Sequence, residues 1–285
     1  SDANGAEYTG QSVVSFDSDG YTTSRTGGNL NDNGWTYAAW NWKAGGTAVS
    51  NTNGTITSSV SANVDAGFSV VTYSGHASNT TVGHGLTSKA PEAILVKNIS
   101  WNDASSNWTC YFAPLTSAYN MRLNGTNAQD GGNHFNGTIS TSTFFVSTSY
   151  RQVNDSGNDY IAYCFHSVDG HSKIGSYTGN GSADGTFVYT GFKPAYVMVK
   201  ESVVGTGNGG WAIFDNKRSE NNVADDSLYA DTSGAESVNN SYQMMDILSN
   251  GFKLRSPSLA SQINYTTSYI FIAFAEQPFK HSNAR

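Results

Sequence analysis

Hydrophobic and polar residues alternate in short runs along this chain, and one such run occurs three times. The three copies cover residues 37–42, 160–165 and 269–274, and each begins with Tyr and ends with Trp or Phe. Each copy follows a polar turn, and a second extended run lies upstream of that turn. The pattern therefore predicts, three times over, a strand, a loop rich in polar turn residues and a second strand.

Both faces of the repeated run are largely apolar. In the first copy, Ala38, Trp40 and Trp42 fall on one face, while Tyr37 and Ala39 fall on the other. Successive side chains of a strand point to opposite sides, and a strand that is apolar on both sides suits a sheet covered on each face. We therefore expect these runs to be central strands.

Helix signals are nearly absent from the sequence. No segment of a dozen residues keeps a helical period after a capped start, and only residues 225–229 could form a single turn. Short strands separated by turn clusters, at roughly 100 residues per unit, are typical of β-sandwiches. The sequence predicts an all-β protein of tandem β-sandwich repeats, of the jelly-roll or lectin-like kind.

Landmark residues recur at equal spacing and indicate an internal duplication. A tryptophan follows eleven residues after a lysine in both copies, and each copy begins with a strand that contains a tyrosine. The matched pairs are Tyr73 with Tyr177, Lys97 with Lys200, and Trp108 with Trp211. We expect complete repeats at residues 67–170 and 171–285.

The N-terminal residues predict only part of a third repeat. Residues 1–7 align with residues 230–236, so residues 1–46 correspond to the C-terminal half of a preceding unit. Residues 47–66 are expected to be a linker with about one strand. A half unit leaves unpaired strand edges and an exposed apolar face. A missing upstream segment, a neighbouring unit or another subunit would cover them.

Charge and cysteine content narrow the choice of partners. A net charge of -7 disfavours sequence-independent binding of nucleic acid, which requires clustered Lys and Arg. No apolar run is long enough to insert in a membrane. Cys110 aligns with Ile213 and Cys164 with Ala273, which favours buried thiols over a disulfide but leaves the disulfide open.

Catalytic and metal-binding patterns receive little support. The chain has six glutamates, and Glu7 and Glu236 occupy the same repeat position, which indicates a structural role. A pair of aspartates could still form a hydrolytic site on a sandwich. Asp17 and Asp19 suggest a calcium loop, but the preference of Asp and Gly for turns explains them better. The six histidines lack the spacing of zinc ligands and are expected at the surface or in turns. We expect no metal and no cofactor.

Several landmarks together resemble a repeat family found in structural proteins of marine bacteriophages. The resembling stretches are residues 16–21, 31–34, 37–46, 65–73, 82–86, 90–91, 175–181, 192–194, 214–218 and 274–280. The resemblance covers almost the whole chain and is specific for the repeat. It implies a tail-fibre-like or other virion-surface component. No catalytic residue carries over from it.

Two tryptophans stand outside the repeated core positions. Trp35 falls at a turn where the second copy has Asn158, and Trp101 falls in a loop where Val204 stands. An unrepeated tryptophan in a polar loop can stack on a sugar face or anchor a protein contact. The neighbours of Trp101, Asn102 and Asp103, could hydrogen-bond sugar hydroxyls. We expect these four residues to be the binding site.

The sequence therefore leaves three functions open. The first is a non-catalytic tail-fibre or adhesin module on the outside of a virion. It would assemble with copies of itself and other virion proteins, and would contact a host-surface glycan or protein. The second is a carbohydrate-active enzyme, such as a capsule depolymerase, on the same fold. The third is a capsid decoration or head-fibre protein, which would differ from the first only in location.

Overall fold

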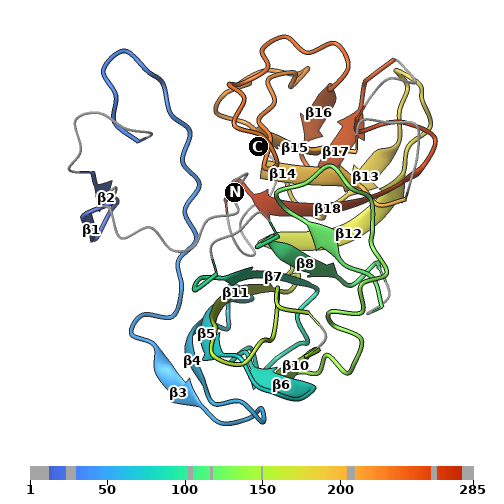
Figure 1. Cartoon of the computed structure of the whole chain (residues 1–285). Coiled ribbons are helices and arrows are strands. Elements are labelled where there is room, and N and C mark those ends of the chain that lie inside the picture. The colour runs from blue at the N-terminus through green and yellow to red at the C-terminus, as the bar shows by residue number, and fades with distance from the viewer. Residues whose placement is uncertain are drawn as a thin grey trace.

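The protein is built of β-strands, as the alternation predicted. The computed structural model describes residues 13–23, 30–101, 105–115, 118–148, 150–203, 209–257 and 262–277. These described residues form strands joined by turns and loops, and they contain no helix. All of the paired strands run antiparallel (Figure 1).

The largest sheet has seven strands and a second sheet has four. The seven-stranded sheet has the order β3-β4-β5-β11-β7-β8-β9. Its strands are β3 Val49–Asn51, β4 Ser58–Asn63, β5 Phe68–Ser74, β11 Asp159–Phe165, β7 Ala93–Asn98, β8 Thr109–Phe112 and β9 Met121–Arg122. The four-stranded sheet consists of β12 Ser172–Thr178, β18 Ser268–Ala275, β14 Pro194–Glu201 and β15 Trp211–Asp215, in that order.

Three smaller sheets complete the fold. The first pairs β10 Thr143–Val146 with β6 Thr80–Gly83. The next has the order β13-β17-β16, with β13 Phe187–Tyr189, β17 Gly251–Leu254 and β16 Met245–Leu248. The last is the hairpin of β1 Ser15–Phe16 and β2 Tyr21–Thr22, which stands apart from the other sheets at the left of Figure 1.

Four of these sheets lie one above another, and a hydrophobic core fills each space between them (Figure 1). The β6/β10 sheet packs on the seven-stranded sheet, and we call these two the first sheet pair. The four-stranded sheet packs on β13-β17-β16, and these form the second sheet pair. A third cluster, the central core, joins the seven-stranded sheet to the four-stranded sheet.

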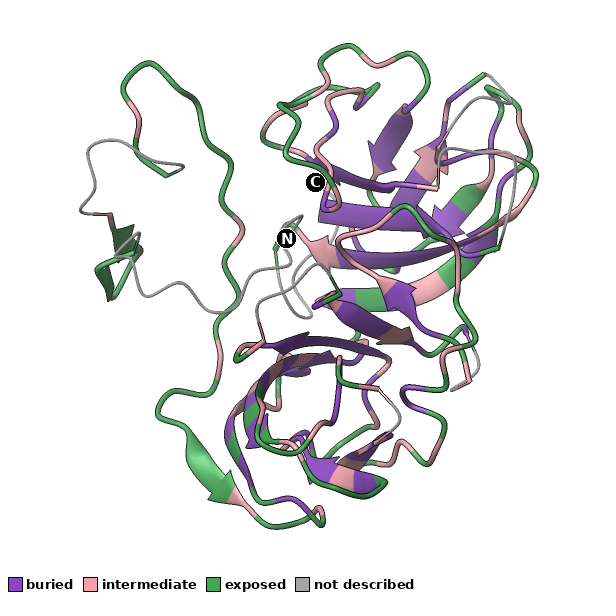
Figure 2. Ribbon diagram, in the orientation of Figure 1, coloured by how far each residue is buried: buried purple, intermediate pink, exposed green. Residues whose placement is uncertain are grey.

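Two of the three repeated runs, β11 and β18, lie in the middle of their sheets with a hydrophobic core on each face, as predicted. The prediction is wrong for the first copy, because residues 37–42 have no neighbouring strand to pair with and form no strand of the described structure. In β11, Tyr160 and Cys164 face the core of the first sheet pair, whereas Phe165 belongs to the central core. In β18, Phe271 faces the core of the second sheet pair and Ile270 belongs to the central core. The burial colours of Figure 2 show both strands within the stack of sheets.

The two large sheets share a strand order. Strands β5-β11-β7-β8 lie side by side in the first, and β12-β18-β14-β15 lie side by side in the second. The ring of Tyr73 stacks on Tyr160 with centroids 5.1 Å apart, and Tyr177 stacks on Tyr269 at 4.9 Å. The hydroxyl of the first tyrosine in each pair donates to a backbone carbonyl at 2.7 Å. Matched residues therefore have matched neighbours.

Residues 47–66 contribute two strands where about one was expected. β3 and β4 extend the seven-stranded sheet beyond β5. The preceding residues follow the same edge, because Ser61 Oγ donates to the carbonyl of Gly46 at 2.6 Å and Asn63 Nδ2 to that of Lys43 at 3.0 Å. Gly45 lies so close to the Ala62 backbone that a Cβ atom would meet the Ala62 carbonyl oxygen at 2.0 Å.

Three smaller expectations have different outcomes. Residues 225–229 form no helical turn, because Leu228 bridges to Ile213 and Ser227 to Ser237, so that prediction is wrong. Cys110 and Cys164 are free and buried, as the core-like positions favoured. The histidines are not all at the surface, because His84, His134 and His166 are buried.

Candidate functional site

A groove beside Trp35 is the first candidate site. The turn at 31–34 places Trp35 outward, with Gly34 in the left-handed region at φ 84°, and 72% of the Trp35 side chain is exposed. The Tyr37 hydroxyl accepts a hydrogen bond from the Asp32 amide at 2.8 Å and so closes the turn. The groove holds about 550 Å³ and is also lined by Leu228, Arg218 and Glu236.

Charged groups on the far side of this groove are fixed in place. Arg218 Nε donates to Asp215 at 2.7 Å, and its Nη1 donates to Glu236 at 2.6 Å. Its guanidinium also lies 5.8 Å from the ring of Trp40. Burial alone would raise the pKa of Asp215, but hydrogen bonds from Arg218 and Lys217 lower it below its usual value. An exposed indole beside a rigid ion pair can bind a polar ligand such as a sugar.

The second predicted tryptophan is less accessible. Trp101 is half-buried, and its amide donates to Asn98 Oδ1 at 2.8 Å. The Arg151 guanidinium lies 5.3 Å from the centre of its ring, in cation–π contact. Asn102 and Asp103 lie outside the described residues. Within the part of the chain that the structure describes, Trp35 and Trp101 thus have different partners.

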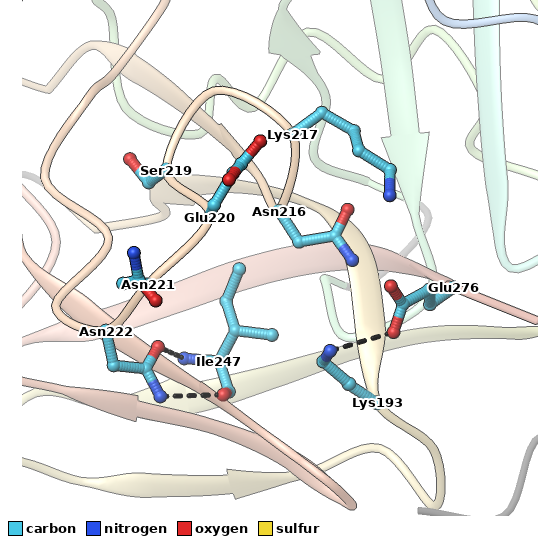
Figure 3. Close-up of a pocket in the computed structure, with 9 residues that line it drawn as sticks. All are labelled: Lys193, Asn216, Lys217, Ser219, Glu220, Asn221, Asn222, Ile247 and Glu276. Carbon is cyan, nitrogen blue, oxygen red and sulfur yellow. Dashed lines mark hydrogen bonds and ion pairs between the residues drawn. The ribbon is translucent and has the colours of Figure 1, made fainter. Parts of the chain in front are cut away.

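A polar cavity of about 380 Å³ lies at one end of the four-stranded sheet (Figure 3). Lys193 Nζ and Glu276 form an ion pair at 2.8 Å on one wall. On another wall the Asn222 side chain exchanges two hydrogen bonds with the backbone of Ile247, at 2.8 and 2.9 Å. These polar groups are already occupied by one another, so the cavity offers few free donors or acceptors on those walls.

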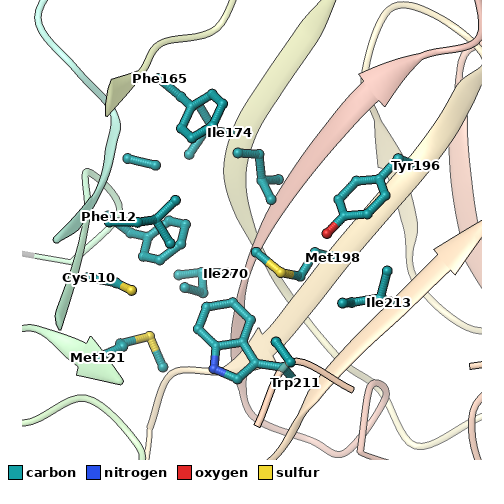
Figure 4. Close-up of a cluster of buried hydrophobic side chains, with 14 of the residues drawn as sticks. Cys110, Phe112, Met121, Phe165, Ile174, Tyr196, Met198, Trp211, Ile213 and Ile270 are labelled. Carbon is teal, nitrogen blue, oxygen red and sulfur yellow. The ribbon is translucent and has the colours of Figure 1, made fainter. Parts of the chain in front are cut away.

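An apolar hollow of about 430 Å³ opens into the side of the central core. Its lining is almost entirely hydrophobic and comes from both large sheets and from the segment before β3. Its aromatic lining includes Trp40, Trp42, Tyr163, Phe165, Tyr196 and Phe274. Figure 4 shows buried side chains of the central core, with Cys110, Phe112 and Met121 on one side and Met198, Ile213 and Trp211 on the other. Such a hollow binds apolar groups.

Acid–base chemistry has one candidate residue among the described carboxyls. Burial raises the pKa of Glu201, an effect that Lys200 partly offsets, and its Oε1 is buried without a hydrogen-bond partner. A glycosidase needs a second carboxylate across the scissile bond. Asp215 and Glu236 both bind Arg218, and hydrogen bonds from Arg218 hold the pKa of Asp215 below its usual value.

The described residues offer neither a cluster of metal ligands nor a helix long enough to cross a membrane. No group of three or more His, Cys, Asp and Glu side chains there could hold a metal ion. The Asp17 carboxylate accepts hydrogen bonds from Ser15 at 2.8 Å and Thr22 at 2.7 Å within the β1–β2 hairpin, as turn chemistry predicts. The described residues also contain no helix that could span a membrane.

Sequence reasoning missed Arg218 and Glu236. Both residues lie far from Trp35 in the chain, and they line the groove because Trp40 and Trp42 pack on Tyr196 and so bring residues 34–38 beside them. The alignment of Tyr37 with Tyr160 and Tyr269 was the one signal that could have placed the first copy beside the others. It does not predict which unit the first copy contacts.

These observations define an all-β protein of several antiparallel sheets with an exposed aromatic groove and an apolar hollow. The chain belongs to the family described as Domain of unknown function (DUF7483), which matches residues 1–278. Comparison with curated proteins gives no match. Comparison with solved structures gives no match either.

Proposed function

We propose that this protein is a non-catalytic structural and adhesive module on the surface of a bacteriophage virion, in a tail fibre or similar appendage. The groove of Trp35 carries the proposal. It combines a largely exposed indole with an arginine that is held by two carboxylates. Aromatic side chains supply rigid contact area, and fixed polar groups orient a ligand against it. A host-surface glycan fits this chemistry.

We also propose that residues 67–170 and 171–285 are duplicated units and that residues 13–46 include the back half of a third. The shared strand order and the two tyrosine stacks support this. So do the two buried lysines that align: Lys97 Nζ donates to Ser106 O at 2.5 Å, and Lys200 Nζ donates to Gly209 O. Tandem units of this kind suit a rigid, extended particle component.

A glycan array tests the adhesive part of the proposal. The full chain should bind immobilised bacterial surface polysaccharides, and Trp35→Ala should weaken that binding at least about tenfold, because Trp anchors carry much of a contact's free energy. Trp101→Ala is the matched control, since the Trp101 ring already contacts Arg151. Equal binding by Trp35→Ala and the parent chain would contradict a role for the groove.

Immunogold labelling of intact particles tests the location. Antibody against this chain should label the outside of the virion, and label on the tail supports a fibre. Label confined to the head would instead support the capsid decoration alternative. Absence of label from intact and from opened particles would contradict a virion protein.

A depolymerase is the second candidate, and Glu201 is the observation that favours it. A buried carboxyl with a raised pKa can act as a general acid. If the chain hydrolyses host capsule, Glu201→Gln should abolish turnover while leaving the polysaccharide bound. No release of reducing ends by the parent chain would remove this candidate.

A further inference from the structure

Three aligned aromatic side chains meet at the mouth of the apolar hollow. Trp42, Phe165 and Phe274 each end one copy of the repeated run. Their ring centroids are 6.4 Å apart for Trp42 and Phe165, 5.3 Å for Trp42 and Phe274, and 5.8 Å for Phe165 and Phe274. All three pairs meet edge to face, at interplanar angles of 74°, 64° and 61°. The three copies of the repeated run thus contact one another through the same aligned position.

The first copy lacks the neighbours that the other two have. Strand β11 is paired on both sides, by β5 and β7, and β18 likewise lies between β12 and β14. Residues 37–42 are extended but belong to no strand of the described structure. Tyr37 is accordingly 48% exposed, whereas Tyr160 and Tyr269 are fully buried.

The local geometry of the first copy is nevertheless already formed. The amide of Asp32 donates to the Tyr37 hydroxyl at 2.8 Å. The equivalent bonds in the other copies join Asp155 to Tyr160 at 2.8 Å and Tyr265 to Tyr269 at 2.9 Å. The turn and its tyrosine are therefore pre-arranged, and what the first copy lacks is a partner for the other face of that tyrosine.

The N-terminal hairpin shows the same deficit. Phe16 faces Tyr21 across β1 and β2, as Ile247 faces Phe252 across β16 and β17. Phe16 is 87% exposed, but Ile247 and Phe252 are buried in the core of the second sheet pair. Strands β12, β14 and β15, from the front half of the same unit, contribute Tyr177, Val197, Val199, Ala212 and Phe214 to that core.

We propose that residues 13–23 and 30–46, together with the apolar hollow beside Trp40 and Trp42, form a docking surface for a front half of this same repeat. The occupant is a polypeptide segment with the pattern of residues 171–229: a strand with an inward tyrosine like Tyr177, a strand ending in a lysine like Lys200, and a strand opening with a tryptophan like Trp211. This inference rests on the proposed duplication. It does not depend on glycan binding.

Counting the halves argues against a second copy of this chain as the occupant. The chain carries three back halves, which contain residues 37–42, 160–165 and 269–274, but two front halves, which contain β5 and β12. Both front halves are already paired with β11 and β18. Any number of copies would therefore leave one back half per chain uncovered. A third front half would pair with the uncovered back half, and it would also fill the hollow between the two large sheets.

Joining such a front half to the full chain tests the proposal directly. An added copy of residues 171–229 is placed ahead of residue 1 of the full chain, and amide hydrogen exchange is followed for residues 37–42. Exchange there should slow by about 100-fold or more, because new strand pairing protects those amides. Residues 160–165 and 269–274 provide the internal reference for a paired strand.

The matched control carries Tyr177→Ala and Val199→Asp in the added copy only, and it should leave residues 37–42 unprotected. If the fused chain does not fold, a synthetic peptide of residues 172–179 added to the parent chain replaces it, and the same protection is expected. Exchange at the parent rate in both formats would overturn the proposal. Protection that grows with the concentration of the parent chain alone would overturn it in favour of a second copy. A failed glycan array alters neither result.

Discussion

Residues that align between the first and second sheet pairs occupy similar positions, but several of them differ in burial and in hydrogen bonding. The larger sheet of each pair contains a run of four strands in the same order, and each sheet pair has one stacked tyrosine pair. Even the turn after β6 matches the turn after β13, since Gly85 and Gly191 both have positive φ, at 74° and 87°. Side chains that differ at such positions therefore have similar surroundings, so their contributions can be compared.

The aligned tryptophans differ most in burial. Trp211 is 1% exposed, and its Nε1 donates to Arg122 O across the central core at 2.8 Å. Trp108 is half-buried and stacks on Tyr163 beside the hollow, with centroids 6.1 Å apart. One position thus joins the two large sheets, while its counterpart lines an opening between them.

The largest expected effect separates these two tryptophans. Trp211→Ala should lower the free energy of unfolding by about 3–5 kcal/mol, because it leaves a cavity in a packed core and an unpaired carbonyl. Trp108→Ala should cost about 1–2 kcal/mol, since its ring borders space that is already open. Urea titration of both variants measures the difference. Equal losses would mean that the hollow is closed in solution.

A histidine gives the first sheet pair an acid sensitivity that the second lacks at the matching site. Burial lowers the pKa of His84 to about 4, although a hydrogen bond to the Ser140 carbonyl opposes this effect. The Leu86 amide donates to His84 Nδ1 at 3.1 Å. In the second sheet pair Thr190 takes the aligned position, and its Oγ1 accepts from the Phe192 amide at 3.4 Å.

Replacing this histidine by its counterpart should reduce that sensitivity. The unfolded chain binds a proton at His84 near pH 6.5 and the folded chain binds it only near pH 4, so stability is full above pH 6.5 and falls as the pH drops between those values. The loss should reach about 3 kcal/mol at pH 4. His84→Thr should flatten the urea midpoint between pH 6.5 and 4, with His76→Thr at an exposed position as the control. An unchanged slope in His84→Thr would assign the acid loss elsewhere.

The sequence predicted much of this comparison, because strand identity is a local property. Alternation and turn residues identified β11 and β18 as central strands, and the alignment predicted buried thiols at Cys110 and Cys164. Contacts between units are not local. Nothing in the pattern of residues 37–42 indicates that Trp40 and Trp42 pack on Tyr196, with centroids 5.4 and 5.7 Å away.

The candidate site was predictable only in part, for the same reason. An unrepeated tryptophan in a turn marked Trp35 as exposed, which the structure bears out. Its charged neighbours Arg218 and Glu236 come from a segment about 180 residues or more further along the chain, and only tertiary packing brings them near. Trp101 carried the same local signal, yet Arg151 covers one face of its ring. Local polarity thus predicts a turn, but it does not reveal what covers a side chain.

The smallest predicted effect tests how equivalent the aligned tyrosines Tyr73 and Tyr177 are, with Tyr37 as an exposed tyrosine for comparison. Tyr73→Phe and Tyr177→Phe each remove one buried hydroxyl that donates to a carbonyl at 2.7 Å, so each should cost about 1 kcal/mol. Tyr37→Phe should cost less than about 0.5 kcal/mol, because its hydroxyl serves an exposed turn. Urea titration of the three variants gives the ranking. If Tyr73→Phe lowered the free energy of unfolding more than twice as much as Tyr177→Phe, the matching hydrogen bonds of the two sheet pairs would not contribute equally to stability.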